Sequence, residues 1–241
     1  MKITERQEQI LDRIVNDYIN LAQPISSELL EKRHGFKICP ATIRIEMQKL
    51  TDLDYLYQPH TSAGRIPTDK GFRFFVNRLL EEESLEAPDK KFRKEIQQIE
   101  KEVEDSLKFF QEITKILAST SSNLVLSYLF DEKIFWKEGW KETLAEPEFE
   151  NIDIVSEFTE MVDNLEENIK DFCRGDFGEI KISIGRENPR FLKTKKFSII
   201  SSTCHFPKKR KGMIAILGPK RMEYPKNISL INSIVKILEK I

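Results

Sequence analysis

The chain has 241 residues and a formal net charge of −1, with 39% hydrophobic and 33% charged residues. This length allows one to three small domains, and the composition is that of a globular protein rather than a fibrous or disordered one. Because the net charge is close to zero, the whole molecule has no strong attraction for polyanions, and a nucleic-acid site would need a local basic surface.

The cysteines, the N-terminus and the apolar runs together indicate the compartment in which the protein works. Cys39, Cys173 and Cys204 are far apart and odd in number, without the spacing of a disulfide framework or a metal site. The N-terminus is too polar for a secretory signal peptide, and no apolar run is long enough to cross a bilayer. We therefore expect a cytoplasmic protein with no cofactor and no metal.

Three helices are expected near the N-terminus, in the order of a helix-turn-helix. Thr4 can cap a helix that runs to about residue 21, and Ser26 or Ser27 can cap a short second helix that ends near Gly35. A third helix is expected over residues 40–53, with proline at its start. Its apolar residues recur at helical spacing and should face inward: Ile43, Met47 and Leu50.

The residues that follow predict a wing. A short strand at 55–58 precedes a loop at 59–67, with Gly64 expected at the tip and Arg65 beside it. Ile66 could return as a second strand, and a fourth helix is expected over 69–80. Residues 1–82 are thus predicted to form a winged helix-turn-helix DNA-binding domain.

The middle of the chain, residues 83–121, predicts a linker and one long helix. Residues 81–89 are acidic and include a proline, and a helix of about 45–50 Å is expected over 89–120. Its narrow apolar stripe fits a coiled-coil seam as well as packing within one chain, which makes it a candidate dimerisation element. The stripe consists of Phe92, Ile96, Ile99, Val103, Phe110, Ile113 and Leu117.

Residues 122–241 predict an α+β domain with an antiparallel sheet, because short apolar strands alternate with two helices and the last strands are joined by hairpin-like turns. The helices are expected at 152–172 and 227–241. The strands are expected at 123–130, 133–138, 179–184, 197–206 and 213–217.

A local basic surface accompanies the predicted helix-turn-helix and wing. Between Lys32 and Arg78 there are nine basic residues and four acidic ones, although the whole chain is nearly neutral. Such an excess is what phosphate binding requires. Lys37, in the turn before the third helix, is one of the expected DNA contacts.

The third helix resembles a recognition helix. Its outward or flanking residues are expected to be Thr42, Arg44, Ile45, Gln48 and Lys49. Arginine can bond bidentately to guanine, glutamine to adenine, and an exposed isoleucine can touch a thymine methyl group. The alternative is that these are ordinary solvated helix residues.

The predicted wing is rich in small and hydroxyl side chains, which let backbone amides approach phosphates. Its expected DNA contacts are His60, Thr61, Ser62, Gly64 and Arg65, the arginine reaching the backbone or a minor groove. The alternative is an ordinary β-turn.

Several of these segments resemble the heat-inducible transcription repressor family HrcA. They are PATIR at 40–44, PHTSAGRIPT at 59–68 and GFRFFV at 71–76. Further likenesses, in PEF at 147–149, IGREN at 184–188 and GPKRMEY at 218–224, extend the resemblance over most of the chain. The SAGRIPT run is a specific signature rather than a generic pattern.

The resemblance implies a fold and a function. The fold is a winged helix-turn-helix, a linking helix and a reduced GAF-like domain at 122–241. The function is that of a homodimeric repressor of chaperone genes, which binds an inverted-repeat operator and is assisted by the chaperonin. The family usually has Asn where this chain has Ile45, so its base specificity is not carried over there. Its members are also usually longer, with a dimerisation domain inserted between Phe130 and Lys133.

Two alternatives stay open beside the repressor. A small ligand in the GAF-like domain could switch the regulator, although Glu187, Asn188 and Arg221 more plausibly pair with each other or cap backbone groups. The winged fold could also dock a protein or RNA instead of DNA. No nucleotide-binding loop, nucleophile elbow or supported acid pair occurs, so an enzyme is not expected.

Overall fold

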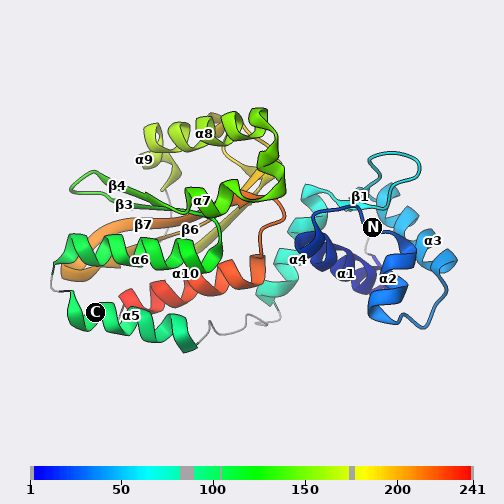
Figure 1. The fold of residues 1–241 in the computed structure, drawn as a ribbon, viewed down its shortest axis with the longest axis horizontal. Coiled ribbons are helices and arrows are strands. Elements are labelled where there is room, and N and C mark those ends of the chain that lie inside the picture. Colours follow the sequence, from blue (N-terminus) through cyan, green and yellow to red (C-terminus); the bar gives the residue numbers. More distant parts are fainter. Residues whose placement is uncertain (1–2, 82–89, 104, 174–176, 240–241) are drawn as a thin grey trace. The chain divides into compact units, whose positions relative to one another are not determined.

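A computed structural model describes residues 3–81, 90–103, 105–173 and 177–239 (Figure 1). The chain divides into two compact units, Met1–Ser84 and Leu85–Ile241, each of which is described by itself. Within the described ranges, no helix combines the length and the apolar character needed to span a bilayer.

The first unit is a winged helix-turn-helix, in which a two-stranded antiparallel sheet follows three helices and precedes a fourth. Its elements are α1 (Glu5–Leu21), α2 (Ser27–His34), α3 (Pro40–Asp52), β1 (Leu56–Tyr57), β2 (Ile66–Pro67) and α4 (Asp69–Glu81).

Capping residues set the ends of these helices. The Thr4 hydroxyl accepts from the Gln7 amide at the start of α1, and the Ser26 hydroxyl accepts from the Leu29 amide at the start of α2. Gly35 ends α2 in the left-handed region, at φ 58°. These local signals explain why the first two helices lie where the sequence predicts them.

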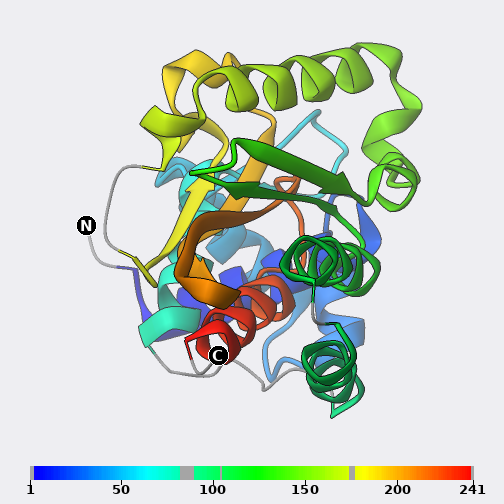
Figure 2. The same cartoon turned by 90° about the vertical axis from the view of Figure 1, so that its left-hand side faces the viewer.

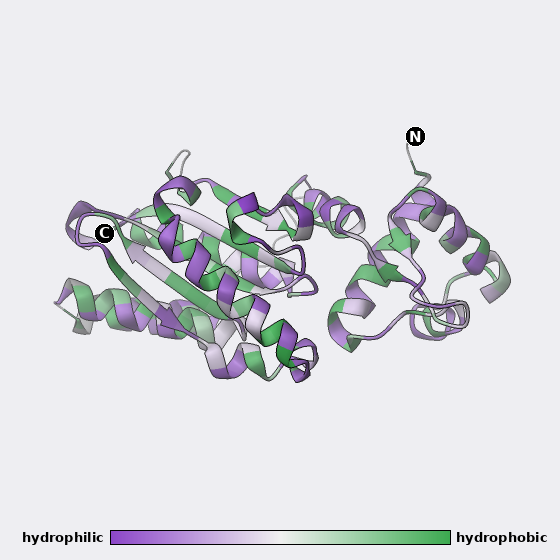
Figure 3. Cartoon of the chain, turned by 90° about the horizontal axis from the view of Figure 1, so that it is seen from above, coloured by the Kyte–Doolittle hydropathy of each residue, from purple (hydrophilic) through white to green (hydrophobic). Residues whose placement is uncertain are grey.

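The helices of the first unit pack around one apolar core. Hydrophobic and hydrophilic segments alternate along the helical ribbons, as amphipathic helices require (Figure 3). The fully buried side chains of this core include Ile10, Leu11, Ile14, Leu30, Ile43, Leu50 and Phe72.

The second unit is built on a five-stranded antiparallel sheet, in the order β4-β3-β7-β6-β5. The strands are β3 (Leu124–Leu129), β4 (Ile134–Glu138), β5 (Ile180–Ile184), β6 (Phe197–Phe206) and β7 (Arg210–Pro219). The helices are α5 (Lys90–Glu102), α6 (Ser106–Ser121), α7 (Trp140–Leu144), α8 (Ile152–Glu167), α9 (Ile169–Phe172) and α10 (Tyr224–Leu238). The α+β class with an antiparallel sheet is therefore confirmed.

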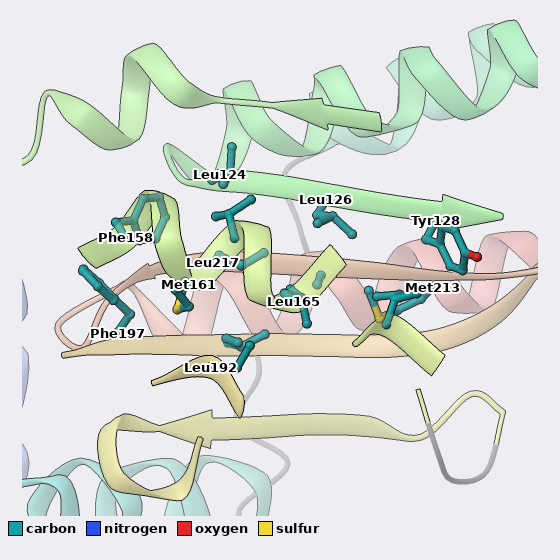
Figure 4. Packing of buried hydrophobic residues seen from close by; sticks show 14 of the residues in the cluster. Leu124, Leu126, Tyr128, Phe158, Met161, Leu165, Leu192, Phe197, Met213 and Leu217 are labelled. Carbon is teal, nitrogen blue, oxygen red and sulfur yellow. The ribbon is translucent and has the colours of Figure 1, made fainter. Parts of the chain in front are cut away.

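Helices cover both faces of this sheet: α8 lies over one face, and α6 and α10 lie over the other (Figures 1 and 2). On the α8 side, alternate residues of the central strands form a buried cluster with Phe158, Met161 and Leu165 of α8 (Figure 4). On the opposite side, Thr114 of α6 donates to the Ser127 hydroxyl of β3 at 2.8 Å.

The prediction of a single long helix over residues 89–120 is wrong. The chain forms two helices, α5 and α6, because the Asp105 carboxylate caps a new helix by accepting from the Leu107 amide at 2.7 Å and the Lys108 amide at 3.3 Å. The two helices then pack against each other, as neighbouring ribbons in Figure 2 show.

Most of the expected dimerisation stripe is consequently covered by the chain itself. Phe92, Ile96, Phe110, Ile113 and Leu117 are each at most 2% exposed within the second unit. The other two members, Ile99 and Val103, are half-buried. As the helices are arranged here, the stripe is part of a core rather than an open seam.

Candidate nucleic-acid interface

Helix α3 has one buried and one exposed side, as its apolar spacing predicts. Ile43 and Leu50 are fully buried and Met47 is 3% exposed. On the other side, Thr42 is half-buried. The exposed residues there are Arg44, Ile45, Gln48 and Lys49. The exposed side therefore offers donors, an acceptor and an apolar group to a ligand.

Two of these exposed residues are lightly engaged. Arg44 forms an ion pair with Glu28 of α2, and the two side chains are 67% and 58% exposed. A pair so exposed contributes little to stability, so the guanidinium can exchange this partner for another acceptor at small cost. Ile45 is 57% exposed, although it is a large hydrophobic residue.

Lys49 forms an ion pair with a less exposed partner within the protein. Its ammonium group lies 3.0 Å from the carboxylate of Glu46, which also accepts from Gln7 of α1 at 2.8 Å. The hydrogen bond from Lys49, followed by that from Gln7, holds the pKa of Glu46 below its ordinary value. Glu46 thus joins α3 to α1, and the exposed Lys49 neutralises its charge from within α3.

The wing is a loop between β1 and β2 that is held by hydrogen bonds within the loop. The two strands pair Leu56 with Pro67 and Tyr57 with Ile66. Gln58 donates through Nε2 to the carbonyl oxygens of Thr61, at 2.9 Å, and Ala63, at 2.8 Å. These bonds hold the loop in one shape. Its exposed residues include His60, Thr61 and Ser62.

The expected position of Gly64 and Arg65 at the wing tip is wrong. Arg65 forms a β-bridge with Ile25, with backbone hydrogen bonds of 2.8 and 2.9 Å in both directions. A Cβ at Gly64 would lie 2.3 Å from the Ile25 carbonyl oxygen, so this glycine allows two backbones to meet. The turn at the tip is made instead by residues 60–63, where the Ala63 amide donates to the His60 carbonyl.

The Arg65 side chain points into the protein rather than out from the wing. It is 8% exposed, and it donates through Nε to the Thr51 hydroxyl at 3.1 Å and through Nη2 to Gln48 Oε1 at 3.0 Å. Burial, and then the nearby charge of Arg44, lower the pKa of Arg65. Thr51 was not among the expected site residues, although it lies one helical turn from Gln48 and shares its side of α3.

A groove of about 730 Å³ separates the wing from α3 and the start of α2. Arg44 and Gln48 line it from α3, Thr61 and Arg65 from the wing, and Ser26 from the start of α2. The groove thus combines cationic groups and small hydroxyl side chains, which suit a phosphodiester backbone, with one carboxylate from α2, the ion-pair partner of Arg44.

The turn between α2 and α3 contributes two more exposed residues. Lys37 is exposed before α3. Cys39 occupies the N-cap of α3, and its Sγ lies 3.3 Å from the Thr42 hydroxyl. That hydrogen bond and the adjacent backbone amides lower the pKa of the thiol.

In the second unit, the polar residues considered for a ligand site serve the fold. Asn188 bonds to the Ser183 hydroxyl and to the Phe197 carbonyl. Glu187 accepts from the Ile184 amide, and Arg221 pairs with Glu146 and Glu148. Among the residues that the structure describes, no group of three or more His, Cys, Asp or Glu side chains could hold a metal ion.

Comparisons with known proteins agree over most of the chain. The family model described as "HrcA protein C terminal domain" matches residues 69–228. A heat-inducible transcription repressor HrcA of Clostridium acetobutylicum is 25% identical over 333 aligned positions, which cover 98% of this chain and 96% of that protein. Since the alignment is longer than this chain, that relative has segments without a counterpart here.

Two further comparisons add a local and a structural likeness. A repressor of the same description from Natranaerobius thermophilus is 52% identical over 80 residues, which cover 33% of this chain and 23% of that protein. A crystal structure titled only as that of a hypothetical protein superposes with a TM-score of 0.80 at 20% identity, over 99% of this chain and 98% of the other. At that identity the match supports the fold alone.

Proposed function

The chain belongs to the HrcA family, and on this premise we propose that it is a transcription repressor that binds double-stranded DNA through α3 and the wing. Its curated relatives carry the name heat-inducible transcription repressor. Such proteins act by occupying DNA and need no catalytic site, so the chain is a regulator rather than an enzyme.

One observation carries the DNA-binding proposal: Arg44, Ile45 and Gln48 lie on the exposed side of α3, and all three line the groove shared with the wing. An α-helix fits the major groove, where arginine and glutamine distinguish bases by paired hydrogen bonds. The wing next to the helix supplies small side chains for phosphate contacts.

The finer features of the proposal concern symmetry and targets. We infer a homodimer that binds an inverted repeat, because a two-fold symmetric protein places two recognition helices on two symmetry-related half-sites. The family resemblance supports chaperone genes as targets and the chaperonin as an assisting partner.

Selection of bound DNA from a random pool by the purified full-length chain tests this function. We expect the enriched sequences to contain an inverted repeat, and light scattering to give a dimer at micromolar concentration. A pool that stays random would contradict sequence-specific binding. Enrichment of one unpaired half-site together with a monomeric mass would contradict the dimer but not the DNA binding.

A further inference from the structure

Arg65 is a buried cation whose partners are neutral. Of its polar contacts within the described residues, the side-chain bonds go to the Thr51 hydroxyl and the Gln48 amide, and none goes to a carboxylate. Burying a guanidinium without an acidic partner costs free energy, so the position of Arg65 calls for an explanation. Its two hydrogen bonds connect the wing to the exposed side of α3.

This link determines how the Gln48 amide is oriented. Arginine has only donors, so the atom that faces Arg65 Nη2 at 3.0 Å must be the amide oxygen. The carboxylate of Asp52 accepts from the other atom, Nε2, at 2.8 Å. The two neighbours together exclude the flipped amide, and each amide atom keeps one further hydrogen-bonding position for a base.

The backbone around Arg65 gives this orientation a rigid base. The β-bridge to Ile25 and the close approach at Gly64 fix the wing root against the segment before α2. Thr51 in turn donates to the Met47 carbonyl of α3 at 2.9 Å while it accepts from Arg65. The guanidinium therefore has little freedom to move toward DNA.

We propose that Arg65 is a positioning residue, which acts through Gln48 to set the base preference of α3 instead of contacting DNA itself. This inference rests on the proposed DNA binding and deepens it. Glutamine reads adenine only when its donor and its acceptor are presented on the correct sides. An amide held in one orientation before binding also loses less conformational entropy when it meets the base.

The test measures discrimination rather than affinity. Each base pair of the selected operator is replaced in turn, and Kd is measured at one salt concentration for the wild type, Gln48→Ala, Arg65→Lys and the double variant. In the wild type, we expect one base pair to be discriminated by about tenfold or more, the range of a good bidentate contact. Both single variants should reduce that ratio to about one to three.

The double variant should discriminate no worse than Gln48→Ala alone, because Arg65 would then have nothing left to position. Arg65→Lys keeps the charge, so its affinity for random DNA should stay within about twofold of wild type. Arg33→Lys is the matched control, since Arg33 pairs with Asp17 rather than with Gln48. It should leave all base preferences unchanged.

Three results would overturn the inference. One is an equal loss on every sequence by Arg65→Lys, which would indicate a phosphate contact. Another is additive losses in the double variant. The third is unaltered preferences in Gln48→Ala. A wild-type chain that selects no sequence would instead contradict the proposed function itself.

Thermal unfolding shows whether Arg65→Lys folds. If it does not, Thr51→Val replaces it, because this change removes one anchor of Arg65 and leaves Gln48 intact. The same base pair should then lose part of its discrimination, and unchanged preferences would again overturn the inference.

Discussion

The exposed side chains of α3 differ in how far the protein already uses them. Gln48 is held by Asp52 and Arg65, and Lys49 is bonded to Glu46. Arg44 forms an exposed ion pair with Glu28, and Ile45 is 57% exposed. Arg44 and Ile45 are therefore the side chains that can adapt most readily to a DNA surface.

Arg44→Ala should weaken binding to the selected operator by about 1–3 kcal/mol and relax selectivity at one base pair. The reason is that arginine contributes a bidentate contact to guanine that alanine cannot replace. Fluorescence anisotropy with specific and random DNA measures both effects. Glu28→Ala is the control, because it frees Arg44 without removing it and should not weaken binding. Equal losses on specific and random DNA would assign Arg44 to the phosphates.

Cys39 should react with iodoacetamide faster than the other two cysteines. It is exposed, and the hydrogen bond with Thr42 lowers its pKa, so more of it is thiolate near neutral pH. Burial raises the pKa of Cys173 to about 12 and also raises that of Cys204. Peptide mapping by mass spectrometry after brief labelling measures the order.

Bound operator DNA should slow the labelling of Cys39, since this residue begins the helix that we place on DNA. In the Cys39→Ser variant, only the slow labelling of Cys173 and Cys204 should remain. Unchanged labelling of Cys39 under saturating operator would argue against the assigned interface.

Helical periodicity predicts which residues of α3 are exposed, but it cannot predict what each one bonds to. The 3.6-residue repeat places Ile43, Met47 and Leu50 inside, as observed. The burial of Arg65 depends instead on a bridge to Ile25, a residue forty positions away that precedes α2. Nothing local in the wing sequence indicates that contact.

At the scale of whole elements, Glu46 joins α3 to α1. Its carboxylate is 11% exposed and accepts from Lys49 and Gln7. Because the pKa of Glu46 in the folded protein lies below its ordinary value of 4.5, folding favours the ionised form. This stabilisation is complete above pH 4.5 and is lost as the pH falls through the lowered pKa.

Glu46→Gln should therefore destabilise the protein by about 1 kcal/mol at neutral pH, a value discounted for the exposure of Lys49. The difference from wild type should shrink as the pH falls from 4.5 through the lowered pKa of Glu46, because the wild-type carboxyl then takes up a proton in the folded protein and loses its charge. Urea unfolding at several pH values measures it. In a Lys49→Met background the effect of Glu46→Gln should be smaller, and a difference that stays constant with pH would contradict the assignment.

The elements that local signals define are the ones the sequence predicts best. Strand β6 spans Phe197–Phe206, the range expected from its apolar run. The helix expected over 89–120 fails because its stripe slips near Ser106, where Asp105 caps a new helix. The slip is visible in the sequence, but a slip of this kind fits a kink, a break or a register shift in a coiled coil equally well.

At the scale of the whole molecule, the proposed homodimer needs a surface through which two chains can pair. Its longer relatives align over 333 positions, more than this chain contains, and the apolar stripe of α5 and α6 is largely buried in the second unit. The proposed dimer is therefore expected to pair mainly through other surfaces, and those surfaces would determine the distance between the two recognition helices.

The spacing of the operator half-sites tests this geometry directly. Inserting five base pairs between the half-sites turns one of them by about half a helical turn, since B-DNA repeats every 10–10.5 base pairs. A dimer that holds its two α3 helices in a fixed relation should then lose about tenfold or more in affinity, because only one half-site can be bound at a time. Gel-shift titration of the original, the expanded and a single half-site DNA measures this. Equal affinity for the first two would mean that the chains bind independently, each through its own α3 and wing.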